Sequence, residues 1–243
     1  MMEAARVGIA GWALRREHQP MFDEGASHLA RYATRFDAVE INSSFYRRHR
    51  AATYARWASS VPETFRFSVK IPKAITHAAK LGEPEAALDE FVGDVSALGM
   101  TLGCLLVQLP PSLQLDTGVA STFFAALRNR FAGAVALEPR HVTWGSPEAD
   151  ALLAQFRIAR VAADPPKVPD GMRPGGWPGL VYYRMHGSPR TYYSTYDDGQ
   201  LAALAADVTS YVRTAIPVWC IFDNTALGAA TPNALELRRL LER

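Results

Sequence analysis

The chain has 243 residues, of which 49% are hydrophobic and 21% are charged, and its formal net charge at pH 7 is +2. This composition is ordinary for a soluble protein with a sizeable core, and the charge is too small to favour nucleic acid or a membrane surface by itself. We expect one domain over residues 1–243.

The compartment follows from what the sequence lacks. Two cysteines, Cys104 and Cys220, favour reduced thiols over a disulfide framework. No segment approaches the roughly 18 apolar residues of a membrane-spanning helix, and the start MMEAARVGIAGW has no long apolar core, unlike a signal peptide. We expect a cytoplasmic protein with no membrane partner; the oligomeric state does not follow from the sequence.

Short apolar runs with polar ends recur along the chain, and most are followed by an amphipathic helical pattern. The runs predict strands at 6–12, 37–42, 65–70, 104–109, 134–139, 158–164, 180–187 and 218–224. Helical patterns occupy 24–36, 84–99, 119–131, 146–157, 198–214 and 231–242. Eight strands alternating with helices in a chain of this length predict an α/β fold of the TIM (β/α)8-barrel type.

One connection breaks the alternation. Residues 165–179, PPKVPDGMRPGGWPG, are rich in proline and glycine where a helix is expected. Both residue types disfavour helix interiors, so we expect a loop that replaces one helix. The predicted barrel is therefore irregular.

The period of two within each strand assigns side chains to faces. In 37–42, Glu40 shares a face with Ala38, whereas Val39 and Ile41 share the other face. The same separation of small or polar from large apolar positions recurs in three other predicted strands. A polar side chain is satisfied more cheaply at the mouth of a barrel than against its helices. We therefore expect the polar positions to face the mouth at the carboxyl ends of the strands, where TIM barrels hold their active sites.

With the strands oriented in this way, a large group of polar side chains is expected to face the mouth. Its members are Glu40, Asn42, Lys70, Gln108, Glu138, Arg140, His141, Asp164, Arg184, His186, Asp223 and Asn224. An ion-pair network that only closes the top of the barrel is one interpretation. So many charges are costly to desolvate without a purpose, which favours a functional site.

The balance of charges suggests the chemistry. Lys70, Arg140 and Arg184 are suited to a carboxylate or phosphate ligand, since arginine grips such groups through two hydrogen bonds. Glu138 or Glu40 is then a candidate general base. His186 is a candidate acid or proton shuttle.

A metal site is the first alternative. Glu40, Glu138, Asp164 and His186 are all competent ligands for a divalent metal. The neighbouring cations would neutralise the same carboxylates, so no cofactor is predicted.

Nucleic acid is the second alternative partner. The basic stretch SFYRRHR at 44–50 would supply phosphate contacts, although a solvated basic loop is the simpler interpretation. Trp144, in EPRHVTW, is placed either to stack on a substrate or to pack below the rim.

The motifs YATRFDAVEINSSFY, FRFSVKIPKAITH, LGCLLVQLPPSL, LEPRHVTW, YYRMHG, FDNTALGAA and NALEL together resemble the family named domain of unknown function 72, the YecE-like proteins. The resemblance covers nearly the whole chain and implies a TIM barrel. The family's characteristic polar positions fall on Glu40, Asn42, Tyr46, Lys70, Gln108, Glu138, Arg140, His141, Trp144, Asp164, Arg184, His186 and Asn224.

The chain departs from the family pattern in three places. Pro139 stands where the family usually has Phe, and Asp223 stands where it usually has Asn. The first loop, WALRREHQPMF at 12–22, lacks the aromatic–proline pattern of the family, so no site residue is predicted from it.

The sequence therefore predicts an enzyme, a hydrolase, lyase or isomerase, that performs acid–base chemistry on a small anionic ligand. The expected catalytic residues are Glu40, Lys70, Glu138, Asp164 and His186. The expected ligand-binding residues are Asn42, Tyr46, Gln108, Arg140, His141, Trp144, Arg184 and Asn224. An endonuclease-like barrel, with or without a metal, and a non-catalytic ligand-binding protein are the alternatives.

Overall fold

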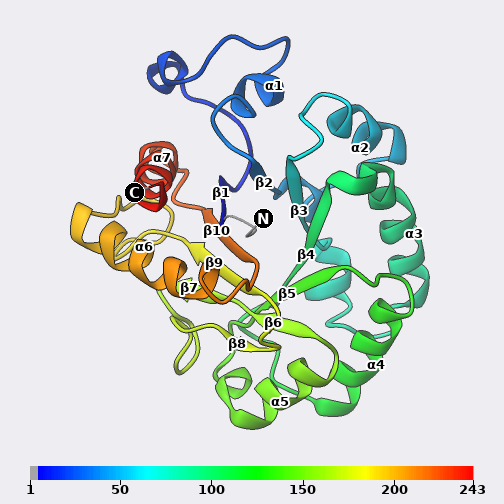
Figure 1. Ribbon diagram of the computed structural model, residues 1–243. Coiled ribbons are helices and arrows are strands. Elements are labelled where there is room, and N and C mark those ends of the chain that lie inside the picture. The colour runs from blue at the N-terminus through cyan, green and yellow to red at the C-terminus, as the bar shows by residue number, and fades with distance from the viewer. Residues whose placement is uncertain (1–4, 243) are drawn as a thin grey trace.

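The computed structural model describes residues 5–242 and shows a mixed α/β fold with parallel sheets (Figure 1). Its strands are β1 (Arg6–Ile9), β2 (Ala38–Ile41), β3 (Arg66–Lys70), β4 (Leu102–Gln108), β5 (Ala134–Glu138), β6 (Ile158–Arg160), β7 (Ala162–Asp164), β8 (Gly175–Gly176), β9 (Val181–Met185) and β10 (Val218–Phe222). Every predicted strand range overlaps one of these strands, although β4 begins two residues before its predicted range, and the range 158–164 contains both β6 and β7.

Seven α-helices lie around the outside of the strands in the described part of the chain (Figure 1). They are α1 (His28–Tyr32), α2 (Ala51–Ala58), α3 (Glu85–Val95), α4 (Thr117–Arg128), α5 (Pro147–Gln155), α6 (Asp198–Val212) and α7 (Ala230–Leu241). All except α2 fall on predicted helical patterns. No helix between residues 5 and 242 is long and apolar enough to cross a membrane.

The strands form two sheets, in the orders β1-β10-β9-β7 and β2-β3-β4-β5-β6-β8. Every pair except β6–β8 is parallel. The sheets meet beside β1, where Ala10 forms a bridge with Glu40 and the Gly11 N–H donates to the Glu40 carbonyl (2.9 Å). On the other side only Val161 separates β6 from β7 in the chain. The parallel arrangement brings the carboxyl ends of the strands together.

The Pro/Gly-rich segment forms no helix, as its composition predicts. Turns and the two-residue strand β8, which the sequence did not predict, occupy this part of the chain. Gly176 has a φ of +65°, and a Cβ there would lie 2.7 Å from the Ile158 carbonyl oxygen. Only glycine permits this close antiparallel approach of β8 to β6.

The core has two separate apolar clusters, one on each face of the strands. Val39 and Ile41 belong to the cluster that also contains the buried residues of the helices, whereas Ala38 belongs to a smaller inner cluster. The inner cluster includes Cys104, Leu106, Ala136, Ala159, Tyr182, Trp219 and Ile221. This division is the one that the period-two pattern predicts, and it places Glu40 on the inner face.

Candidate functional site

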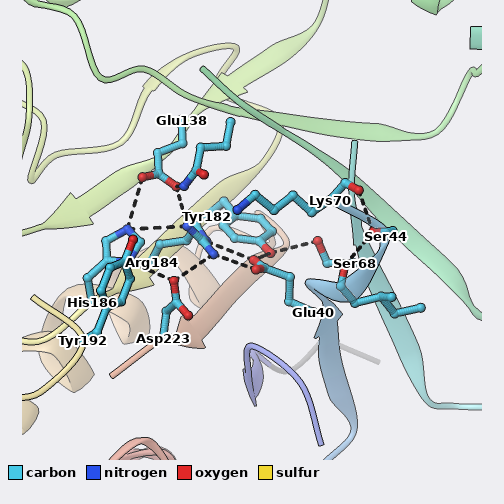
Figure 2. A network of polar contacts seen from close by, with 12 residues as sticks. Glu40, Ser44, Ser68, Lys70, Glu138, Tyr182, Arg184, His186, Tyr192 and Asp223 are labelled. Carbon is cyan, nitrogen blue, oxygen red and sulfur yellow. Dashed lines mark hydrogen bonds and ion pairs between the residues drawn. The ribbon is translucent and has the colours of Figure 1, made fainter. Parts of the chain in front are cut away.

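Polar side chains meet above the inner cluster, at the carboxyl ends of the strands (Figure 2). Several of them lie on the same face of their strands as the inner cluster, each two residues after a small or apolar residue of that cluster. Glu40 follows Ala38, Glu138 follows Ala136 and Arg184 follows Tyr182. The alternation of the strands therefore carries the charges to one place.

Arg184 is the centre of this network. Its Nε and Nη2 donate to the two carboxylate oxygens of Glu40 (3.0 and 2.6 Å), Nη1 donates to Glu138 (2.6 Å), and Nη2 also donates to Asp223 (3.1 Å). The side chain is fully buried. Burial alone would lower the pKa of Arg184, but the three carboxylates raise it well above its ordinary value. Arg184 is therefore a permanent cation whose donors are held by the protein itself.

His186 lies between two carboxylates. Its Nδ1 lies 3.1 Å from Asp223 Oδ2 and its Nε2 lies 3.1 Å from Glu138 Oε1. A carboxylate oxygen only accepts, so each contact is a hydrogen bond when the ring nitrogen carries a proton; Nε2 also lies 3.5 Å from Arg184 Nη1. Burial opposes a positive charge on His186, but Glu138 and Asp223 outweigh burial and raise the pKa of His186. Asp223, a departure from the family pattern, thus supplies one of the two counter-ions.

Glu138 is the most heavily bonded acid. It accepts from Gln108 Nε2 (3.0 Å) and Arg140 Nε (3.2 Å), in addition to Arg184 and His186. Burial alone would raise the pKa of Glu138, but Arg184, His186 and Arg140 hold it well below its ordinary value. A carboxylate with so low a pKa is a weak base at neutral pH. Its geometry is that of a fixed counter-ion.

The second acid, Glu40, is fixed from below. The Tyr182 hydroxyl donates to Glu40 Oε2 (3.1 Å) and lies 2.8 Å from the Ser68 hydroxyl oxygen. Burial and the Glu40 charge raise the pKa of Tyr182 well above its ordinary value, so this phenol stays protonated. Neither Tyr182 nor Ser68 is predicted from the sequence as a site residue.

Lys70 differs from the rest of the network. It is only 4% exposed, and Figure 2 shows its side chain extended towards Arg184 and Tyr182. Within residues 5–242 its ammonium forms no hydrogen bond or ion pair; Nζ lies 4.0 Å from the centre of the Phe45 ring. Burial, followed by the repulsion of Arg184, lowers the pKa of Lys70 to about 8.

His77 and Arg140 face the same region. The His77 ring packs edge-on against Phe45, with 4.9 Å between the ring centres, and its Nδ1 lies 2.9 Å from the Thr76 hydroxyl. Burial, then Lys70 and Arg140, lowers the pKa of His77, so its imidazole is neutral at pH 7. His77 belongs to a short π-helix, Ala74–Ala78, a type of turn that is frequent at functional sites.

Arg140 connects this group to the loop after β9. Its Nη2 lies 3.4 Å from the Tyr192 hydroxyl, and its side chain is 19% exposed. Of the two predicted arginine ligands, Arg140 therefore reaches solvent, whereas Arg184 does not.

Other predicted residues lie at the margins of the network. Tyr46 is 75% exposed, and Trp144 is 1% exposed with its Nε1 donating to the Leu113 carbonyl (3.0 Å). Trp144 thus packs below the rim in this structure. The His141 side chain caps the short helix that follows it, by accepting from the Thr143 N–H (3.3 Å).

Two further predicted residues position the loop that follows β9. The Asp164 carbonyl accepts from the His186 N–H (2.8 Å). Asn224 Nδ2 donates to the Ser194 carbonyl (3.0 Å) and to Asn233 Oδ1 (2.9 Å). These contacts hold the loop over the network.

A cavity of about 610 Å³ opens at the same end of the strands. It is lined by Ile9, Ala10, Gly11, Trp12, Ala13, Leu14, Arg15, His28, Asn42, Ser43 and Thr225. Asn42 is a predicted ligand-binding residue, and its buried Oδ1 lacks a hydrogen-bond partner in the described structure. Most of the wall comes from the loop after β1, from which the sequence predicts no site residue, because the loop departs from the family pattern.

The structure can also be compared with the two alternatives, a metal ion and a nucleic acid. Between residues 5 and 242, no group of three His, Cys, Asp or Glu side chains is arranged to hold a metal ion. In the basic stretch, Arg48 pairs with Glu90 and with Asp94 (2.6 Å), and His49 is buried against the Ser43 hydroxyl (2.8 Å). Part of this basic stretch therefore ties the loop to α3.

Comparison with known proteins places these features in a family context. The sequence profile described as protein of unknown function DUF72 matches residues 6–243. UPF0759 protein YunF of Bacillus subtilis (strain 168) is 23% identical over 268 aligned residues, covering 97% of this chain and 94% of that protein. UPF0759 protein YecE of Escherichia coli (strain K12) is 30% identical over 104 residues, which are 43% of this chain and only 37% of that protein.

Two solved structures share the fold. A DUF72 family protein from Enterococcus faecalis V583 has a TM-score of 0.83 at 23% identity, covering 98% of this chain and 96% of that one. A DUF72 family protein from Thermotoga maritima MSB8 has a TM-score of 0.80 at 24% identity, covering 99% and 100%. At this level of identity, the likeness shows a common fold.

Proposed function

The chain belongs to the DUF72 family, and from that premise we propose that it is an enzyme that performs acid–base chemistry on a small anionic ligand. The proposed site is the mouth formed by the carboxyl ends of the parallel strands, above the Arg184 network. This end of the sheet is where enzymes with parallel α/β architectures place their chemistry.

The proposal includes closure of the two sheets into an irregular (β/α)8-type barrel. The bridge between Ala10 and Glu40 on one side and the nearly continuous β6 and β7 on the other support it. In such a barrel the Pro/Gly-rich segment would leave one gap in the layer of helices.

The lone ammonium of Lys70 is the observation that carries the proposal. A buried cation that serves stability alone is normally paired, because an unpaired buried charge costs several kcal/mol. The nearby acids Glu40, Glu138 and Asp223 are already held by Arg184 and His186. A pKa of about 8 leaves Lys70 able to exchange a proton near neutral pH.

The roles then divide between a fixed scaffold and a reactive group. We assign Arg184, His186, Glu40, Glu138 and Asp223 to the scaffold, which sets the local field. Lys70 and the neutral imidazole of His77 are the groups suited to proton transfer, and the partly exposed Arg140 is suited to hold an anion. This differs from the sequence-based hypothesis, in which Glu138 or Glu40 is the general base and His186 is the acid or proton shuttle.

A thermal-shift screen with small carboxylates and phosphates tests the proposal, because a ligand that binds the folded state raises the melting temperature. We expect some of these anions to stabilise the wild type but not Arg140→Gln. The matched control is Arg190→Gln, which alters an exposed cation that stacks on Tyr193 (3.9 Å to the ring centre) instead of facing the network.

Equal stabilisation of wild type and Arg140→Gln by every anion would contradict the anion site. Binding of DNA or RNA that is lost on neutralising Arg47 and Arg50 would instead favour the nucleic-acid alternative. Ligand binding with no turnover, unaffected by Lys70→Met, would favour a non-catalytic ligand-binding protein.

A further inference from the structure

We propose that Lys70 forms a Schiff base with the ligand, so that the substrate class is a small carboxylate with an adjacent aldehyde or ketone group, such as a 2-oxo acid. This inference rests on the proposed function for the location of the site and goes beyond it in naming a covalent step and the functional group that undergoes it.

The first support is the surroundings of the amine. An amine attacks a carbonyl only when it is unprotonated and unencumbered. Lys70 Nζ rests against the Phe45 ring, 4.0 Å from its centre, and no described oxygen accepts from it. A lysine held by a carboxylate would remain protonated and fixed. Here the Arg184 guanidinium takes up Glu40 and Glu138 and keeps them from the amine.

The second support is a neutral base beside the same ring. Phe45 contacts both Lys70 Nζ, which lies over its ring, and the His77 imidazole, which packs against the ring at 80°, so both groups adjoin one aromatic side chain. His77 is half-buried, and the cations Lys70 and Arg140 disfavour its protonation. A neutral imidazole in this position is suited to take a proton from the attacking amine and return it to the departing oxygen.

The third support is the anchor for the acid group. Arg140 is the arginine of the network that retains exposure, and its Nη2 lies 3.4 Å from the Tyr192 hydroxyl. A carboxylate next to the carbonyl carbon would bind there, and this would place the carbonyl beside the Arg184 network, towards which Lys70 extends (Figure 2).

The step balances without an oxidant or a metal. The neutral amine attacks the carbonyl carbon, a C–N bond forms as the C=O π bond breaks, and one proton passes from the nitrogen through His77 to the oxygen, which gives a neutral carbinolamine. His77 then takes a proton from solvent and gives it to the hydroxyl, which leaves as water when the C–O bond breaks. The nitrogen keeps its remaining proton, so the product is an iminium ion that withdraws electrons from the neighbouring carbon.

Reductive trapping tests the inference. The protein is incubated with glyoxylate and sodium cyanoborohydride at pH 7, and the carboxymethylated lysines are identified by peptide mass spectrometry. The other lysines, Lys73, Lys80 and Lys167, are exposed and serve as internal controls in the same sample. Because the pKa of Lys70 is about 8 instead of 10.5, its neutral fraction at pH 7 is greater by roughly three hundredfold. We expect Lys70 to be labelled at least about tenfold faster than the controls.

Two variants sharpen the outcome. Lys70→Arg keeps the positive charge and should lose the fast labelling, whereas Lys73→Arg should keep it. Labelling of Lys70 no faster than the three exposed lysines would overturn the Schiff base. If glycolate or phosphate nevertheless stabilised the wild type through Arg140, the proposed function would stand while this inference failed. Failure of both experiments would reject both.

Discussion

At the scale of single residues, most charged groups of the site are paired with one another, whereas the ammonium of Lys70 has no hydrogen-bond or ion-pair partner in the described structure. Arg184 donates to three acids, and two of them, Glu138 and Asp223, also contact His186 and raise its pKa. Lys70 enters the same space with its ammonium unpaired in the described structure. The paired residues stabilise the fold and set the local electric field, whereas the unpaired lysine supplies reactivity. Substitution of a paired residue should therefore lower the stability of the protein, and substitution of Lys70 should raise it.

Arg184→Met should destabilise the protein strongly. The variant leaves Glu40, Glu138 and Asp223 buried without their shared cation, which costs about 3–5 kcal/mol when a buried pair is broken from one side. Urea unfolding followed by circular dichroism measures the loss. Adding Glu138→Gln to the variant should recover part of it. Arg239→Met, which removes an exposed pair with Glu236, is the matched control and should change little. A wild-type midpoint in Arg184→Met would show that the network is not a stabilising unit.

Lys70→Met should have the opposite effect on stability. The pKa of Lys70 is about 8 in the folded protein and 10.5 when unfolded, so the folded state binds fewer protons between these values, and its stability rises with pH across that window. Below pH 8 the full penalty of the buried charge applies. We expect the variant to be more stable at pH 7 by roughly 2–3 kcal/mol, and the difference to shrink as pH rises towards 10.5. If the stability difference between the variant and the wild type did not vary with pH, the pKa of Lys70 would not be lowered in the folded protein.

At the scale of elements, alternation within strands predicts more than any other signal. The separation of Val39 and Ile41 from Ala38 and Glu40 follows from the pleat, and the structure shows it in its two apolar clusters. The convergence of the network was therefore accessible from the sequence. The position of Phe45 against Lys70 and His77 was not, because Phe45 and His77 belong to a short 3-10 helix and a short π-helix, which no apolar periodicity predicts.

The helix α2 shows why one element was missed. The residue before it, Arg50, makes no side-chain cap, so the start of the helix has no local signal. The Ala51 N–H instead donates to Asp94 Oδ1 (3.1 Å), at the end of α3 and 43 residues away in the chain. A cap supplied from another helix is a tertiary contact that a local pattern does not reveal.

Asp94→Ala should therefore loosen α2 specifically. Loss of a side-chain cap costs about 1 kcal/mol, and the variant also removes one of the two acids that pair with Arg48, Asp94 (2.6 Å), and leaves the other, Glu90. Hydrogen exchange should show faster exchange of the amides of Ala51–Ala58 than in the wild type, with the network strands unaffected. The control is Glu90→Gln, which removes only the exposed partner of Arg48. Equal exchange in α2 for Asp94→Ala and Glu90→Gln would contradict the role of the cap.

At the scale of the whole molecule, the network joins the two sheets. Glu40 and Glu138 belong to one sheet, whereas Arg184 belongs to the other. The backbone contacts at Ala10 and Val161 also connect the two sheets. The sheets are therefore expected to fold and unfold together, although neither the composition nor the strand pattern specifies which sheet an individual strand joins.

Urea unfolding of the wild type should consequently show one transition, with tryptophan fluorescence and far-ultraviolet circular dichroism giving the same midpoint. Arg184→Met removes the side-chain link and should separate the two midpoints or broaden the transition. Two distinct transitions in the wild type would show that the sheets are independent units.

Ionic strength offers a way to address scaffold and ligand site separately. The Arg184 pairs are fully enclosed, and mobile ions cannot enter between the charges, so their attraction should persist in sodium chloride of about 1 M. Arg140 retains exposure, and its attraction for an anion should be screened under the same conditions. Such a solution would therefore release the ligand from an intact site, which offers a gentle means to elute an unknown natural ligand from the purified protein and identify it.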